Sequence, residues 1–183
     1  MRLSLVGCWR CLGPAGCHGR LGHDGLRGVS CTARLLDEQA PNTARAVWDA
    51  LPQRGDALHA KYARNEIYAL VPAFADVEPG RENTTITPIP GDVAYFMFDQ
   101  WQLNTPGHGY VDGQASLDRP EIVDLALFYE RNNLLLNPDY GWVPANIFAT
   151  ITEGLDRMAA AATDMWLKGV ENEVLSFSRL PEQ

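Results

Sequence analysis

The feature that most constrains the fold is a series of short β-prone segments, separated by turn residues and interrupted by only two helical patterns. Strand candidates occupy residues 29–36, 57–62, 66–71, 84–89, 93–98, 146–151 and 173–180. Residues 121–129 fit a helix or a strand by composition, and their aromatic end favours a strand. The run from Val93 to Phe98 is apolar throughout and is predicted to be buried on both faces. Because strands and helices do not alternate as βαβ units, the order predicts an α+β fold or a closed all-β core.

Two helices are predicted from apolar residues that recur at helical spacing. The first begins at Pro41, which suits the first helical position, and ends at Pro52 and Gly55. The second begins with Thr152 as its N-cap and ends at Gly169. The expected apolar faces are Ala44, Val47, Trp48 and Leu51 in the first helix, and Leu155, Met158, Ala159, Ala162 and Trp166 in the second.

The first 28 residues differ in composition from the rest of the chain, because arginines, glycines and most of the cysteines gather there. The four cysteines are Cys8, Cys11, Cys17 and Cys31. Three interpretations are open: a zinc site that includes His18 and His23, an Arg-rich targeting segment, or an unstructured extension from a start codon assigned too early. The cysteine spacing matches no standard zinc motif, and the apolar stretch is broken by Arg10. We therefore expect residues 1–28 to be an extension and residues 29–183 to form the folded domain.

Charge and hydropathy exclude several classes of partner. The 183 residues carry 23 acidic and 15 basic side chains, a formal charge of −8, without a cluster of Lys and Arg that could displace counterions from nucleic acid. No apolar run approaches the ~20 residues that span a bilayer. We expect no nucleic-acid partner, no membrane partner and a cytoplasmic protein without disulfides.

Several short motifs resemble those of cyclophilins. The segments 40–43 (APNT) and 146–156 (NIFATITEGLD) are similar to the cyclophilin first-helix opening and strand-to-helix passage, and 90–95 (PGDVAY) resembles a turn of the compact bacterial cyclophilin-like proteins. Residues 128–135 (FYERNNLL) and 141–146 (GWVPAN) resemble one uncharacterised branch of that group. Over residues 29–180 the resemblance implies a mostly β protein with two helices, a closed or nearly closed cyclophilin-like β-barrel, distantly related to cucumopine synthase.

The sequence also departs from these relatives. Glu130 and Ala145 stand where the branch has glycine, and the strand implied before Val29 is not evident in residues 15–28. The pattern of a prolyl isomerase is missing, since residues 64–70 (RNEIYAL) lack the F-H-R strand and the later pocket segments do not follow. We expect no prolyl isomerase activity, because a shared fold does not carry function.

Candidate ligand-binding residues are polar or aromatic side chains on the strands and on the loop after residue 129. A histidine in a strand is either a hydrogen-bonded wall residue or a general base, and strand tyrosines either fill the core or present hydroxyls to a ligand. Arginine and asparagine after a buried strand could fork onto a carboxylate, or the asparagines could cap their own loop. The candidates are His59, Tyr68, Tyr95, Tyr129, Arg131, Asn132 and Asn133. No metal or cofactor is expected.

Three functions fit these observations. The first is a protein that binds a small anionic metabolite at the barrel mouth, with Arg131 and Asn133 as anchors. The second is an enzyme that uses acid–base chemistry on an amino- or keto-acid-like substrate; a pocket group with a shifted pKa, such as His59 or Glu130, would indicate it. The third is an oligomeric accessory protein, with Trp101 or Trp142 at its interface. We also expect a homo-oligomer.

Overall fold

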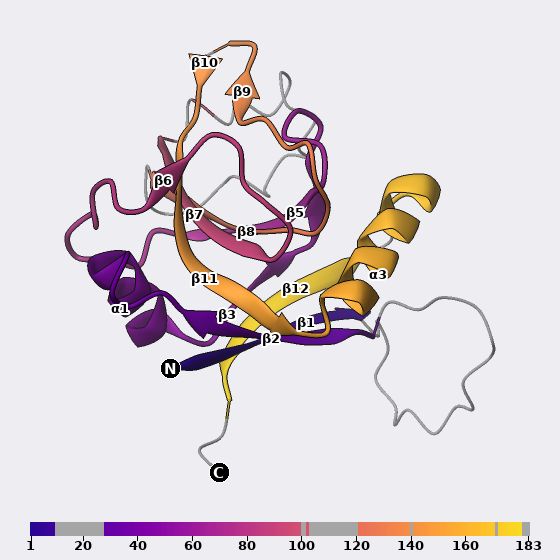
Figure 1. Cartoon of the computed structure of the whole chain (residues 1–183), viewed down its shortest axis with the longest axis horizontal. Helices are drawn as coiled ribbons and strands as arrows, with labels where there is room; N and C mark the ends of the chain where they lie inside the picture. Colours follow the sequence, from indigo (N-terminus) through magenta and orange to yellow (C-terminus); the bar gives the residue numbers. More distant parts are fainter. Residues whose placement is uncertain (10–27, 100–101, 103–120, 140, 171, 181–183) are drawn as a thin grey trace.

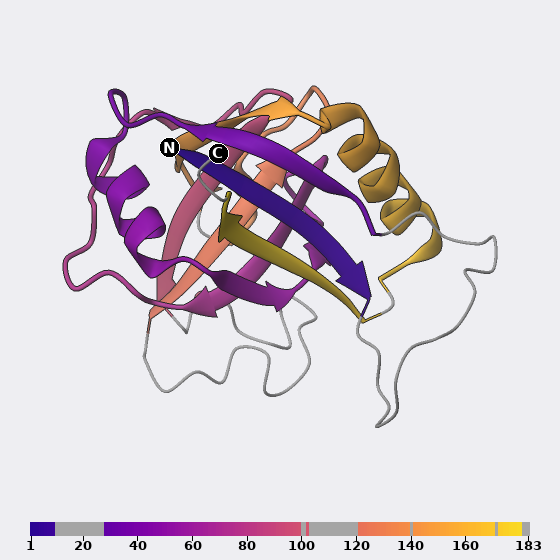
Figure 2. The same cartoon turned by 90° about the horizontal axis from the view of Figure 1, so that it is seen from below.

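The computed structural model describes residues 1–9, 28–99, 102, 121–139, 141–170 and 172–180. Most of them form one antiparallel sheet that curls into a barrel, with two helices on opposite sides of it (Figures 1 and 2). The helices are α1 (Pro41–Ala50) and α3 (Leu155–Lys168). The strands are β1 (Arg2–Trp9), β2 (Ser30–Leu35), β3 (Gln53–Asp56), β4 (Leu58–His59), β5 (Glu66–Pro72), β6 (Thr84–Thr85), β7 (Asp92–Asp99), β8 (Glu121–Phe128), β9 (Leu136–Asn137), β10 (Gly141–Trp142), β11 (Ala145–Glu153) and β12 (Glu173–Arg179). The predicted mostly β fold with two helices is confirmed.

The barrel closes through a strand segment that changes partners. The sheet order is β3-β12-β1-β2-β11-β7-β8-β5-β4, with β6 added on β11. β3 pairs with β12 at one end of this order, and β4, only one residue further along the chain, pairs with β5 at the other. Between them the Ala57 N–H donates to the Glu173 carbonyl oxygen over 2.8 Å. Residues 53–59 thus connect the two ends of the sheet, and the barrel is nearly closed.

The central strands are buried on both faces. On β8, Val123, Leu125 and Leu127 point into the main core inside the barrel, whereas Ala126 and Phe128 belong to a second apolar cluster outside it. β5 and β7 alternate in the same way, because successive side chains of a strand point to opposite faces. This explains why the β7 and β8 sequences lack the polar alternation of a half-exposed strand, and it confirms that residues 121–129 form a strand.

Residues 2–9 correct the prediction of an N-terminal extension. β1 lies between β12 and β2 and pairs with both, and its Leu3 and Leu5 are fully buried. The alternating Leu3-Ser4-Leu5 pattern is the signal of this strand, but the Gly-, Arg- and Cys-rich residues that follow obscured it. The strand implied before Val29 therefore exists, further upstream than residues 15–28. Residues 10–27, which contain Cys11, Cys17, His18 and His23, lie outside the described residues.

The helices differ from their predictions in detail. α1 begins at Pro41 as predicted, and its apolar stripe packs on the barrel. α3 begins after Gly154 in place of a Thr152 cap; Gly154 has a φ of +82°, and a Cβ there would lie 2.9 Å from the Ser30 carbonyl oxygen. Trp166, predicted on the buried face of α3, is 60% exposed. The buried face consists of Met158, Ala161, Ala162 and Met165.

The N-terminus of α1 is capped by a carboxylate from a distant loop. Ala40 precedes the helix without a side-chain cap. The Glu82 carboxylate instead accepts hydrogen bonds from the backbone N–H groups of Asn42 and Thr43, at 3.2 and 2.8 Å, and from both of their side chains. The Asn146 amide donates in turn to the Thr43 hydroxyl over 3.0 Å and accepts from the Glu82 N–H. This network joins α1, the loop at Glu82 and β11.

Replacing Gly55 with alanine is expected to destabilise the closure of the barrel. The added Cβ would lie 2.9 Å from the Leu70 carbonyl oxygen and 3.1 Å from the Ala69 Cβ. Because a backbone oxygen cannot move aside easily, we expect the free energy of unfolding in urea to fall by about 1–3 kcal/mol. Gly28→Ala is the control, since its Cβ would meet no atom within 4 Å. Equal stability of the two variants would contradict the close approach of β3 to β5.

Replacing Glu82 with alanine is expected to lower the free energy of unfolding by about 1 kcal/mol, the usual effect of losing a helix cap. Slight burial acts to raise the pKa of Glu82, but the hydrogen bonds from Thr43 and Asn42 lower it below its ordinary value of 4.5. A carboxyl whose folded-state pKa is lowered stabilises above the unfolded value and stops doing so as pH falls through the folded one. The stability difference between Glu82→Ala and the wild type should therefore shrink below pH 4.5; a constant difference would exclude this cap.

Candidate functional site

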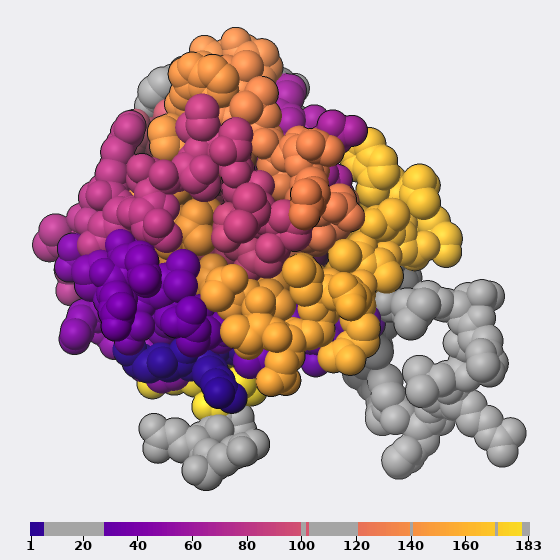
Figure 3. Space-filling model, in the orientation of Figure 1, coloured from indigo at the N-terminus to yellow at the C-terminus, as the bar shows by residue number. Residues whose placement is uncertain are grey.

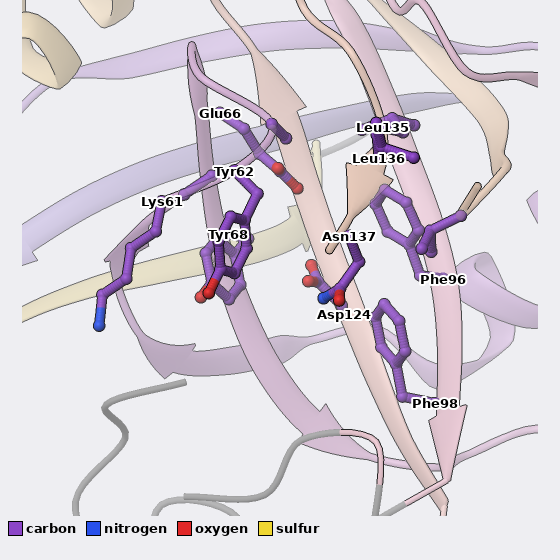
Figure 4. A pocket seen from close by; sticks show the side chains of 13 residues that line it. Lys61, Tyr62, Glu66, Tyr68, Phe96, Phe98, Asp124, Leu135, Leu136 and Asn137 are labelled. Carbon is purple, nitrogen blue, oxygen red and sulfur yellow. The ribbon is translucent and has the colours of Figure 1, made fainter. Parts of the chain in front are cut away.

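A pocket lies on the outer face of the barrel, beneath the segment that carries the β9–β10 hairpin. The hairpin and its flanking residues project from the molecule in the space-filling view (Figure 3). The pocket has a volume of about 100 Å³. Its floor is formed by side chains of β5, β7 and β8, and its walls by residues 60–63, residues 135–137 and Val143 (Figure 4). The lining residues are Ala60, Lys61, Tyr62, Ala63, Glu66, Tyr68, Phe96, Phe98, Asp124, Leu135, Leu136, Asn137 and Val143.

The strand register determines which side chains reach this floor. Glu66, Tyr68 and Leu70 share one face of β5, and they stand opposite Phe128, Ala126 and Asp124 of β8. Phe96 of β7 stands opposite Asp124 on the other side. Because side chains alternate along a strand, these residues all face outward from the barrel. Two carboxyl groups thus occupy a surface that is otherwise apolar and aromatic.

Both carboxyl groups are more than nine-tenths buried. The exposed fractions of Glu66 and Asp124 are 5% and 7%. They are four positions apart in the register, about 13 Å along the strand direction at 3.3 Å per residue. Their side chains therefore reach the pocket from separate points on β8 and β5, with Asp124 beside Asn137 (Figure 4). In the described part of the chain, Oδ1 of Asp124 is buried without a hydrogen-bond partner.

Burial shifts the acidity of both groups. Loss of solvent raises the pKa of Glu66 to about 8. The same loss of solvent, together with the nearby charge of Glu66, raises the pKa of Asp124 well above its ordinary value. Burial disfavours the ionised form of a carboxyl group, and a second negative charge disfavours it further. Near neutral pH the protonated form of Glu66 is consequently favoured, and ionisation of Asp124 is made more costly than usual.

Of the seven candidates predicted from the sequence, Tyr68 is the one that lines this pocket. His59 and Tyr129 form a separate pair. The Nδ1–H of His59 donates to the Ala60 carbonyl oxygen over 3.1 Å, which leaves Nε2 to accept from the Tyr129 hydroxyl over 2.8 Å. Trp166 of α3 packs on the imidazole, with ring centroids 4.9 Å apart. Burial lowers the pKa of His59, although the bond to Ala60 opposes the shift. Through its contacts this neutral histidine connects β4 to Tyr129, which follows β8, and to α3.

Tyr95 lies in a third place, at the edge of the main core. Its hydroxyl donates to Oε2 of Glu78 over 2.9 Å, and its ring packs edge-on against Phe74. Burial raises the pKa of Glu78, although the hydrogen bond from Tyr95 acts to lower it. The pair borders a hollow of about 220 Å³ that also includes Asp76 and Glu121.

Arg131, Asn132 and Asn133 follow β8 in an ordered turn. The Asn133 side chain, 5% exposed, accepts from the Asn65 N–H over 3.1 Å and donates to the carbonyl oxygens of Pro88 and Glu130, at 3.0 and 2.7 Å. These are the bonds of a loop cap. Asn132 is exposed, with a φ of 66°, and Arg131 is exposed outside the pocket. Glu130 and Ala145 do not have positive φ, so replacing glycine there leaves the backbone unstrained.

Sequence reasoning missed Glu66 and Asp124, the two groups with shifted pKa in the pocket, and considered His59 and Glu130 instead. The signal was present, because each is an acid inside or at the start of a strand that is otherwise apolar (EIYALVP and EIVDLALF). Nothing in either segment alone shows that the two acids face one pocket.

In the described ranges, no group of three or more metal-ligating side chains occurs. No helix there combines the length and apolar composition of a membrane-crossing segment.

Comparison with known proteins supports the fold and names the family. No curated protein matches the sequence. The structure described as McbB in complex with tryptophan is similar, with a TM-score of 0.57 and 18% identity; the match covers 99% of this chain and 45% of that one, so this chain spans less than half of McbB. The solution structure of the hypothetical protein AF2241 from Archaeoglobus fulgidus has a TM-score of 0.47 and 22% identity over 98% of this chain and 95% of that one. Residues 25–177 match the family described as protein of unknown function (DUF3830), and the chain belongs to that family.

Proposed function

We propose that the protein binds a small organic metabolite in the outer-face pocket and acts on it by acid–base proton transfer through Glu66 and Asp124. The observation that carries this proposal is the presence of two carboxyl groups, each more than nine-tenths buried, in a pocket with aromatic walls. Ligand pockets are mostly apolar with a few polar groups that orient the ligand, and buried carboxyl groups with shifted pKa are typical of catalytic sites.

The chemistry suits general acid–base catalysis. A group transfers protons most effectively when its pKa lies near the working pH, and burial brings Glu66 to about 8. Asp124, held at a different point of the floor and influenced by the Glu66 charge, has a separate environment. Two carboxyl groups whose environments differ can take the acid and base roles in one reaction. Prolyl isomerisation is not part of this proposal, since the pocket lining contains no arginine among the described residues.

The size of the pocket and one structural relative suggest where to look for the ligand. The cavity of about 100 Å³ accommodates a side chain or a ring, and its open side allows a longer molecule to extend outward. McbB, which has the same fold, is described in complex with tryptophan. Aromatic amino acids and the corresponding keto acids are therefore the first compounds to test.

A thermal-shift panel of phenylalanine, tryptophan, phenylpyruvate, hydantoin and 2-phenylethylamine tests the binding part. We expect at least one compound to raise the unfolding midpoint, with a stabilisation of about 2.7 kcal/mol at 100 times its dissociation constant. Glu66→Gln and Asp124→Asn should remove the shift without unfolding the protein, because an amide imitates the protonated carboxyl group. The control Glu153→Gln alters an exposed carboxyl at the end of β11. A shift unaffected by the pocket variants would contradict this site.

Proton transfer is tested by exchange of the ligand's carbon-bound hydrogen in D₂O, followed by proton NMR. We expect the wild-type protein to catalyse exchange of the hydrogen next to the carboxyl or carbonyl group of the bound compound. Asp124→Asn should reduce that rate by about 100-fold or more, the usual contribution of general acid–base catalysis. Tight binding without exchange would leave a binding protein and refute the catalytic part.

An anionic metabolite held by Arg131 and Asn133 is a second candidate, and one substitution pair separates ligand anchoring from loop structure. Asn133→Ala removes three hydrogen bonds of a buried amide and is expected to lower the free energy of unfolding by about 1–3 kcal/mol. Arg131→Ala, at an exposed position, should leave the unfolding midpoint nearly unchanged. If Arg131→Ala abolishes binding of an anionic compound such as phenylpyruvate, this second site is supported.

The accessory and oligomeric alternatives rest on exposed apolar side chains. Trp142 of β10 is 57% exposed, and Trp101 lies outside the described residues. Exposed aromatic residues are common at protein interfaces. We retain a homo-oligomer as a proposal, to be measured by light scattering of the purified protein.

A further inference from the structure

The hydrogen-bonding inventory of the pocket shows what a ligand must supply. Oδ1 of Asp124 is an acceptor that is buried, lines the cavity and has no donor among the described residues. A buried acceptor without a donor is costly, because it has lost its hydrogen bonds to water. When Asp124 is ionised, a ligand that fills this position must donate a hydrogen bond to Oδ1. A carboxylate ligand has no donor and cannot satisfy the ionised group.

The charges around the pocket favour a cation. The ionisable groups that face it are Glu66 and Tyr68 from β5, Asp124 from β8, and Lys61 and Tyr62 from the segment between β4 and β5. β7 contributes only Phe96 and Phe98, and the hairpin contributes the neutral Asn137. Lys61 is exposed, and its ammonium group points away from both carboxyl groups (Figure 4). The floor of the pocket thus has acidic groups without a described cation between them.

The walls suit the body of such a ligand. The rings of Phe96 and Phe98 lie nearly parallel, with centroids 5.8 Å apart, along one side of the cavity. Aromatic faces attract cations and also cover apolar surface. A compact molecule with a ring at one end and a charged nitrogen at the other matches both features.

From this arrangement we propose that the ligand presents a protonated nitrogen to Glu66 and Asp124, so that its class is a small amine or amino compound with an apolar body. This inference rests on the proposed function, because it assigns a ligand class to the same pocket. The ammonium group donates to Oδ1 of Asp124, and its single positive charge compensates the carboxylate that forms when a proton is released. The ring lies against Phe96 and Phe98.

The charge of the ligand determines how affinity varies with pH. In the empty pocket burial raises the pKa of Glu66 to about 8 and that of Asp124 well above its ordinary value, so the protonated forms are favoured. A cation stabilises the ionised form, lowers these pKa values and releases protons on binding, so affinity rises with pH. An anion stabilises the protonated form, and its affinity falls as pH rises. The two ligand classes therefore give slopes of opposite sign.

The test is isothermal titration calorimetry with three probes that share a phenyl ring and an alkyl chain: 2-phenylethylamine, 3-phenylpropionate and 2-phenylethanol. We expect the amine to bind at least tenfold more tightly than the other two at pH 7.5. Its affinity should rise between pH 6 and 8, by up to tenfold per pH unit for each proton released. Titrations in two buffers of different ionisation enthalpy count the protons directly.

Variants then connect the result to the pocket. Glu66→Gln and Asp124→Asn should each weaken amine binding at least tenfold and reduce the pH slope, whereas the exposed controls Asp37→Asn and Glu153→Gln should not. If a pocket variant does not fold, the sign of the wild-type pH slope still decides the matter. Tighter binding of 3-phenylpropionate, equal binding of phenylethanol, or no binding of the amine at millimolar concentration overturns the ligand class. If the pocket variants alter binding of such a non-amine probe, the proposed site survives; if they leave binding of every probe unchanged, the site itself is refuted.

Discussion

Packing on both faces of β5, β7 and β8 is the constraint on which the rest of the structure depends. One face of these strands fills the barrel, with Val123, Leu125 and Leu127 of β8 in the main core, and the other is covered by residues 60–63, residues 135–137 and Val143. A carboxyl group on the covered face is removed from water wherever it stands. Ionising it there is costly unless a cation compensates, so it takes up a proton instead. The raised pKa values of Glu66 and Asp124 are thus a consequence of the architecture, and they require no special catalytic residue to produce them.

The covering of that face depends in turn on how the barrel closes. Residues 53–59 pair first with β12 and then with β5, and the chain leaves β4 directly into the wall of the pocket at Ala60 and Lys61. β12 is held in the sheet by β1, which lies between it and β2. The first strand of the chain therefore supports, through β12 and the 53–59 segment, a wall of a pocket that it does not touch. Loss of β1 would open the sheet at its centre, because β12 and β3 would lose their connection to β2.

The sequence predicted those parts of the fold whose apolar pattern is local. The runs at 66–71, 93–98 and 121–129 and the two helices are recognisable because each buries enough apolar surface to determine its own conformation. β3 (QRGD) was missed because it is polar and pairs with β12 from a distant part of the chain. The site was harder to predict for the same reason. Glu66 and Asp124 look like single acids in two separate strands, and only the register of β5 against β8 places them on one floor. Asn133 was predicted as a ligand anchor because it is polar and follows a buried strand; its hydrogen bonds fasten the loop, and its role as an anchor stays a prediction.

The pocket floor gains its selectivity from the fact that its charge is not fixed. Two protonated carboxyl groups present a neutral surface with both donors and acceptors, and two ionised groups present a doubly negative one. The ligand determines which state prevails, because it binds most tightly to the state that complements it and shifts the protons accordingly. A cation with N–H donors fills the unpartnered oxygen of Asp124 and relieves the repulsion that ionisation would otherwise create with Glu66. An anion instead favours the protonated state of both groups. The same burial that favours the protonated carboxyl groups in the empty pocket therefore makes the pocket responsive to a positively charged nitrogen, and a carboxylate left by the release of a proton is a base that can accept a proton from the ligand.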